Sequence, residues 1–120
     1  HNPAEGGDSG PFARLDTLRE RMNYHGAAEK PIYITEYGES TANCGSECVS
    51  EATQAAHLGS MLNAVVERKE WKVEMISFFQ LHDWATNSTN RERQFGLLRH
   101  NGTPKPSYAI VRDAVQRYRG

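Results

Sequence analysis

Hydrophobic positions follow a helical spacing in some stretches of the chain and form continuous runs in others. Between Pro11 and Gly26 the apolar residues recur every three or four positions, which is the spacing of one helix face. Proline suits the first turn of such a helix, and glycine suits its end. A second helix is expected from Ser50, a favourable N-cap residue, to about Lys69.

Two other stretches are apolar without helical spacing and predict buried strands. The first begins at Pro31, is rich in β-branched residues, and delivers the carboxylate of Glu36 just before Gly38. The second is Val73–Leu81. A near-continuous apolar run favours a parallel strand that is covered on both faces.

The predicted order is loop, helix, strand, helix, strand, helix, which indicates an α/β fold with two parallel strands. Long polar loops follow only the strands, as in parallel βα repeats, where ligands bind at the carboxyl ends of the strands. Phe95–Leu98 is expected to be extended, and the last helix is expected after Pro106. Its predicted buried stripe is Tyr108, Val111, Ala114 or Val115, and Tyr118.

Composition and charge exclude several classes of protein. A chain of 120 residues, 38% hydrophobic and 24% charged, is expected to form a single globular domain without a second one. Its net charge of −1 gives no basis for binding nucleic acid or an anionic membrane. The sequence contains neither GxGxxG nor GxxxxGK[ST], so nucleotide cofactors are not expected, and no cofactor or metal is predicted.

Glu36 is the first candidate for chemistry. A carboxylate at the end of an apolar strand is costly to hold there without a use or a partner. Two interpretations stay open: a catalytic carboxylate, or a structural one paired with an arginine of the next loop. Glu39, beyond the glycine, is expected at the loop surface.

A second group of polar and aromatic residues follows the other strand. By the period of two, Gln80, His82 and Trp84 share one strand face, whereas Leu81 and Asp83 share the other. An aromatic ring beside amide and carboxylate groups is typical of a sugar site. The alternative is that Trp84 only caps the hydrophobic core.

Three motifs resemble one family of enzymes. The stretch from Pro31 to Gly38 is similar to the seventh-strand signature of clan A retaining glycoside hydrolases, a set of (β/α)8 barrels that includes families 5 and 39. Phe78–Trp84 resembles their eighth strand, and Phe95–Tyr108 resembles the run into their last helix. The resemblance covers nearly the whole chain, with the motifs in the family's order.

The resemblance implies that residues 1–120 are the carboxyl-terminal part of a catalytic TIM barrel, from the sixth helix to the eighth. Glu36 would be the nucleophile, and Trp84 would floor the sugar cleft. Asp83 and Gln80 would orient loops or sugar hydroxyls, and His1 would be the remnant of a sixth-strand histidine. The implied substrate-binding residues are Tyr37, Gln80, His82, Asp83, Trp84 and His1.

The family's second catalytic carboxyl group has no counterpart here. It belongs to an Asn-Glu pair, which occurs nowhere in this sequence, so the acid/base is expected outside the chain and the isolated chain is expected to be inactive. The expected substrate is an oligosaccharide, polysaccharide or glycoside, with β-linked, cellulase-like substrates favoured. The alternatives are a non-catalytic carbohydrate-binding or pseudo-enzyme module, and a flavodoxin-like domain in which Glu36 is structural.

An incomplete barrel also carries a physical expectation. The partner of this chain would be the amino-terminal part of the barrel. A complete barrel of this kind takes about 250 residues. Without it, the barrel-facing sides of both strands, including Ile32, Ile34 and several of Met75–Phe79, are expected to be exposed. An isolated chain should then be marginally stable or associate.

Cys44 and Cys48 lie in the loop after the first strand. A local disulfide is the first interpretation, with free thiols and a metal site as alternatives, although zinc would need two further ligands. A disulfide would imply export, and hence an extracellular protein. Asn87 and Asn101 each begin a tripeptide of the N-glycosylation pattern.

Overall fold

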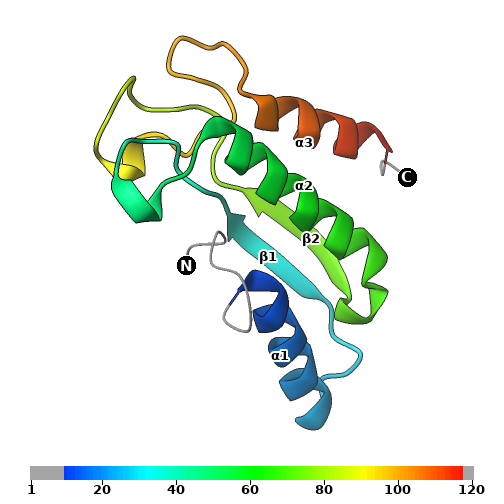
Figure 1. Ribbon diagram of the computed structural model, residues 1–120. Coiled ribbons are helices and arrows are strands. Elements are labelled where there is room, and N and C mark those ends of the chain that lie inside the picture. The colour runs from blue at the N-terminus through cyan, green and yellow to red at the C-terminus, as the bar shows by residue number, and fades with distance from the viewer. Residues whose placement is uncertain (1–9, 118–120) are drawn as a thin grey trace.

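The computed structural model describes residues 10–117, in which helices and strands alternate in the predicted order (Figure 1). The main elements are α1 (Pro11–Tyr24), β1 (Ile32–Tyr37), α2 (Glu51–Glu67), β2 (Val73–Phe78) and α3 (Pro106–Arg117). Short 3-10 turns are η2 (Gly45–Glu47), η3 (Lys69–Trp71) and η4 (Arg91–Arg93). None of the helices within 10–117 is both long enough and apolar enough to cross a bilayer.

The two strands pair in parallel, which confirms the predicted α/β class with two parallel strands. Figure 1 shows both arrowheads pointing to the same end of the sheet, where the long loops gather and where α1 begins. The helix α2 lies along one face of the sheet, and α3 packs on α2. This arrangement places every strand-to-helix loop at the carboxyl end of the sheet.

The hydrophobic core lies between the helices and one face of the sheet. It consists of buried residues from α1, β1, α2 and η3: Leu15, Ile32, Met61, Ala64 and Trp71. The indole Nε1 of Trp71 donates to Asp16 Oδ1 at 2.6 Å. The buried guanidinium of Arg19 donates to the carbonyl oxygen of Trp71 through Nε and Nη2, at 3.1 and 2.9 Å.

The opposite face of the sheet is open, but different residues occupy it from those predicted. Ile32 is only 6% exposed and Ile34 is half-buried, so the prediction that both would be exposed is wrong. Strand alternation turns these residues toward the helices and turns Tyr33, 57% exposed, and Met75 outward. The strands are therefore covered on one face within the described chain, rather than on both.

The second strand is shorter than predicted. β2 ends at Phe78, where the chain turns through a cis Phe79–Gln80 peptide bond. The amide of Phe79 still donates to the Tyr37 carbonyl oxygen of β1 at 2.9 Å. From Gln80 on, the backbone bonds to the 95–98 segment instead: the amide of Gln80 donates to the carbonyl oxygen of Phe95 at 3.2 Å, and the amide of Leu98 donates to the carbonyl oxygen of Leu81 at 2.8 Å. Leu81 therefore lies in a loop.

The last helix follows its predicted stripe in part. Ala114 is buried, and Val115, the alternative to it, is exposed. Tyr108 and Val111 are half-buried. Tyr118 lies outside the described residues.

Candidate functional site

Glu36 lies within a bulge of β1. Ile34 pairs with Ile76, but the next pair joins Tyr37 to Phe78, which leaves one more residue on β1 than on β2. Bulges bend a strand and re-aim its side chains, and they are frequent beside active sites. The side chain of Glu36 is exposed and lines a cleft at the carboxyl end of the sheet.

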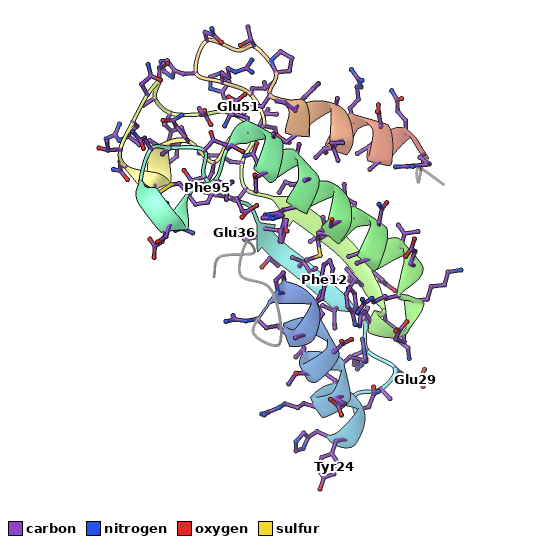
Figure 2. The ribbon with its side chains drawn as sticks, in the orientation of Figure 1. Phe12, Tyr24, Glu29, Glu36, Glu51 and Phe95 are labelled. Atoms are coloured by element: carbon purple, nitrogen blue, oxygen red, sulfur yellow. A yellow bond between two sulfur atoms is a disulfide. The ribbon has the colours of Figure 1, made fainter. Side chains whose placement is uncertain are left out.

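The cleft has a volume of about 380 Å³ and is lined by residues of α1, β1, α2 and the loop after β2. Its charged lining residues are Arg14, Glu36, Arg91 and Glu92. Its aromatic lining residues are Tyr37, Phe79 and Phe95. Figure 2 shows Glu36 at the carboxyl end of β1, with Phe95 beyond it on the side of the loops. The cleft combines rings with charged groups, a lining that suits a molecule with apolar faces and polar edges.

The rings of Phe79 and Phe95 pack edge to face, with centroids 5.4 Å apart. Gly38 allows this arrangement, because a Cβ atom at that position would collide with the carbonyl oxygen of Phe79. Tyr37 is half-buried beside them; burial and, secondarily, the charge of Glu39 raise the pKa of its phenol. Its hydroxyl therefore stays protonated and available as a hydrogen-bond donor at neutral pH.

The side chain of Glu36 makes no hydrogen bond or ion pair with any residue of the described range 10–117. The structural alternative required an arginine partner in the following loop. Arg91, from the loop after β2, lines the same cleft but pairs with Glu92 instead, Nη1 to Oε1 at 3.7 Å. Glu36 thus presents its carboxylate to the cleft without a partner among the described residues.

Glu39 is buried, and the prediction of a surface position is wrong. Only 4% of it is exposed, and its Oε1 lies 2.7 Å from His57 Nδ1 on α2. The loop turns back under α2, where Gln54 Nε2 donates to the carbonyl oxygen of Glu39 at 3.0 Å. Burial raises the pKa of Glu39, and the hydrogen bond and charge of His57 oppose that shift.

Asp83 is enclosed among the loops. It is 2% exposed, and its Oδ1 accepts from the Gly96 amide at 2.7 Å and from Lys105 Nζ at 2.8 Å. Lys105 also donates to Thr41 Oγ1 at 2.9 Å. Burial lowers the pKa of Lys105, whereas its hydrogen bond with Asp83 raises it. The pair therefore ties together the loop after β1, the loop after β2 and the segment that leads to α3.

The structure brings two of the predicted site residues, Glu36 and Tyr37, into the cleft lining. Gln80, His82 and Trp84 are not among the cleft-lining residues; Trp84 is 58% exposed on the loop surface. His82 Nδ1 lies 2.9 Å from the Asp83 carbonyl oxygen. The sugar contacts predicted for these three residues and for Asp83 stay predictions. His1 lies outside the described residues.

Several cleft residues were not singled out from the sequence, among them Arg14, Phe79, Arg91 and Phe95. Strand periodicity gave no signal for Phe79, because it would place this residue on the face of Leu81 and Asp83, away from Gln80. Arg91 and Phe95 reach the cleft only through loop packing. A signal was available for Phe95, an aromatic residue directly before Gly96, where a Cβ would collide with the backbone of Asp83.

Cys44 and Cys48 form a disulfide, as the first interpretation proposed, with Cα atoms 5.5 Å apart. The bridge closes a small loop beside the Ser40 to Cys48 pairing, and the Val49 amide donates to the Ser40 carbonyl oxygen at 2.9 Å. Within residues 10–117, no cluster of three or more His, Cys, Asp or Glu side chains is placed to hold a metal ion.

No protein-family model matches this sequence, and no curated protein sequence matches it. Solved structures do. GH5_18 from Streptomyces cattleya in complex with GlcNAc aligns with a TM-score of 0.68 and 19% identity, over 89% of this chain and 25% of its own. A GH2 β-galacturonidase from Eisenbergiella tayi bound to galacturonate aligns with a TM-score of 0.65 and 24% identity, over 88% and 20%.

A family 39 glycoside hydrolase from Bacteroides cellulosilyticus WH2 aligns with a TM-score of 0.64 and 22% identity, over 87% of this chain and 21% of its own. At these identities the likeness concerns the fold. The chain spans about a fifth to a quarter of the length of these neighbours. It has the fold of part of a glycoside hydrolase barrel, similar to those of families 5, 39 and 2.

Proposed function

We propose that this chain contributes to the active site of a retaining glycoside hydrolase, with Glu36 as the nucleophile. The observation that carries the proposal is the placement of Glu36. Its carboxylate lies at the carboxyl end of a parallel strand, in a cleft lined by aromatic rings, with no partner among the described residues. In βα barrels, catalytic groups occupy this position.

In the proposed reaction a carboxylate oxygen of Glu36 attacks the anomeric carbon, and the glycosidic C–O bond breaks. A second carboxyl group, about 5–5.5 Å away in such enzymes, protonates the departing oxygen. It then removes a proton from the water that hydrolyses the glycosyl-enzyme ester. We place this second group outside the present chain, and we expect the chain alone to be inactive.

The neighbouring solved structures are consistent with a carbohydrate substrate, since GH5_18 was solved in complex with GlcNAc and the β-galacturonidase bound to galacturonate. We propose an oligosaccharide, a polysaccharide or a simpler glycoside. The disulfide supports a further proposal, export to the extracellular space, because such bonds persist in oxidising compartments.

A non-catalytic carbohydrate-binding module is the second candidate. The large exposed ring of Trp84, which lies outside the cleft lining, favours it, since a sugar could stack there without meeting Glu36.

Covalent labelling tests the nucleophile. A protein that contains this chain within a complete barrel is incubated with 2,4-dinitrophenyl 2-deoxy-2-fluoro-β-glycosides, whose leaving group needs no protonation. We expect the peptide that carries Glu36 to gain the mass of one fluorosugar, and Glu36→Gln to prevent the labelling. Glu39→Gln is the matched control, which should still be labelled. A label on another carboxylate, or turnover retained by Glu36→Gln, would contradict the proposal.

A further inference from the structure

Arg91 lies in the cleft with most of its hydrogen-bonding capacity unused. It belongs to η4, in the loop after β2, and lines the cleft together with Glu36. Its side chain is 31% exposed. Its Nε is buried and has no hydrogen-bond partner among the described residues, and its ion pair with Glu92 is long, at 3.7 Å.

Two other arginines show the hydrogen bonding of a guanidinium that has a structural role in this fold. The buried Arg19 donates through Nε, Nη1 and Nη2 to the carbonyl oxygens of Trp71, Ala28 and Lys30. Arg99 donates through the same three nitrogens, to the Glu51 carboxylate, Thr103 Oγ1 and the Pro104 carbonyl oxygen. Buried donors in native proteins are nearly always paired. Arg91 therefore lacks the side-chain hydrogen bonds that the two structural arginines make.

The position of Arg91 is nevertheless fixed. Its guanidinium carbon lies 4.9 Å from the centroid of the Phe95 ring, which is buried and packs against Phe79. Stacking on a ring holds the plane of the guanidinium while leaving its in-plane N–H groups free to donate. A cation that is oriented but not hydrogen-bonded is prepared for an acceptor that enters from the cleft.

We propose that Arg91 binds a carboxylate on the substrate, so that the cleft takes glycosides of acidic sugars, the uronic acids. This inference rests on the proposed function, since it places the sugar beside Glu36. A guanidinium matches a carboxylate in shape and charge better than it matches a hydroxyl group. Arg14, Glu36 and Glu92 are the other charged groups that line the cleft, so the sugar must direct its carboxylate toward Arg91 and away from the two acids.

Sugar titrations of the 15N-labelled 120-residue chain, followed through its amide resonances, test the inference. The ligands are methyl β-D-glucuronide, methyl β-D-galacturonide, methyl β-D-glucoside and glucose 6-sulfate. We expect at least one uronide to shift the amides of Gly38 and Phe95 and to bind roughly tenfold more tightly than the glucoside, the gain of one charge-assisted contact. The sulfate should bind several-fold more weakly than that uronide.

Variants separate Arg91 from general charge effects. Arg91→Gln should reduce uronide binding to the level of the glucoside, whereas Arg93→Gln, an exposed neighbour outside the cleft lining, should keep the preference. The dispersion of the amide spectrum shows whether each variant is folded. A preference that survives Arg91→Gln, equal binding of sulfate and uronide, or no amide shift with any sugar would overturn the inference. Equal binding of glucoside and uronides in the cleft would overturn it while leaving the proposed glycoside site intact.

Discussion

The two ends of the sheet are built differently. At the amino end, the fully buried Trp71 is held by Asp16 and Arg19, and each of these polar groups has a close partner. At the carboxyl end lie the buried polar atoms that lack a hydrogen-bond partner among residues 10–117: Glu39 Oε2, Gln80 Nε2 and Arg91 Nε. Incomplete satisfaction of buried polar groups is costly, and it concentrates where function requires it.

This contrast assigns different tasks to the two ends. The amino end fixes α1 and η3 to the strands, and its contacts are complete within the described chain. The carboxyl end holds its loops with charged pairs and leaves Glu36 and Arg91 turned to the cleft. Substitutions at the amino end should therefore change stability, and substitutions at the carboxyl end should divide into those that loosen loops and those that change only ligand binding.

The largest expected loss of stability is at the amino end. Trp71→Ala removes a fully buried ring together with the indole N–H that donates to Asp16, although the bonds from Arg19 to the backbone carbonyl of this residue remain. It should lower the free energy of unfolding by about 4 kcal/mol. Urea denaturation followed by circular dichroism measures this. The control, Trp84→Ala, removes an exposed ring and should cost less than about 0.5 kcal/mol. Similar losses for both variants would contradict the comparison.

The next largest effect concerns the buried pair at the other end. Asp83→Asn keeps the shape and the acceptor for the Gly96 amide but leaves the Lys105 charge uncompensated, at a cost of about 3 kcal/mol. Urea denaturation of the single variant and of Asp83→Asn combined with Lys105→Met measures it. The double variant should recover most of the loss, because it no longer buries a lone charge. A double variant as unstable as the single one would show that the pair does more than tie loops.

How far the sequence predicts each end follows from the range of the interactions. The order of helices and strands and the place of Glu36 at the end of its strand depend on short patterns, such as the strand run that ends at Gly38. The burial of Glu39 depends on His57, on the following helix, and local polarity suggested the opposite. Arg91 and Phe95 reach the cleft through a loop that is held by distant groups, such as the bond from the Thr41 amide to the Gln94 carbonyl oxygen.

The sheet shows the same limit. Alternation correctly predicts that Ile32 and Ile34 face one side and Tyr33 the other, but it does not say which side the helices cover, so the predicted exposure of Ile32 is wrong. The bulge between Ile34 and Tyr37 depends on pairing with β2. No pattern within β1 alone reveals an extra residue of this kind.

A smaller effect is expected at the disulfide of the loop after β1. Replacing Cys44 and Cys48 together with serine frees a short loop, and a closed loop of this length contributes roughly 2 kcal/mol in the chain-entropy description. Thermal unfolding of the double variant, and of the native chain with and without reductant, measures the loss. Reductant should lower the melting temperature of the native chain only. An equal response of the double variant would mean that the reductant acts elsewhere.

The smallest expected effect is on the pH dependence of stability. It tests the charge of a buried group at the carboxyl end rather than its packing. Burial raises the pKa of Glu39 above its usual value of 4.5. The folded chain therefore binds a proton at Glu39 more readily than the unfolded chain, so this contribution is complete below about pH 4.5 and is lost as the pH rises through the raised pKa. Compared with Glu39→Gln, the native chain should lose stability as the pH is raised from about 4 to 7.

Urea denaturation at several pH values gives the two stability curves. The control is Glu47→Gln, which replaces an exposed carboxylate of the same loop and should follow the native curve. Parallel curves for the native chain and Glu39→Gln would mean that His57 fully offsets the effect of burial on the pKa of Glu39. The pair would then add no pH dependence to the stability of the carboxyl end.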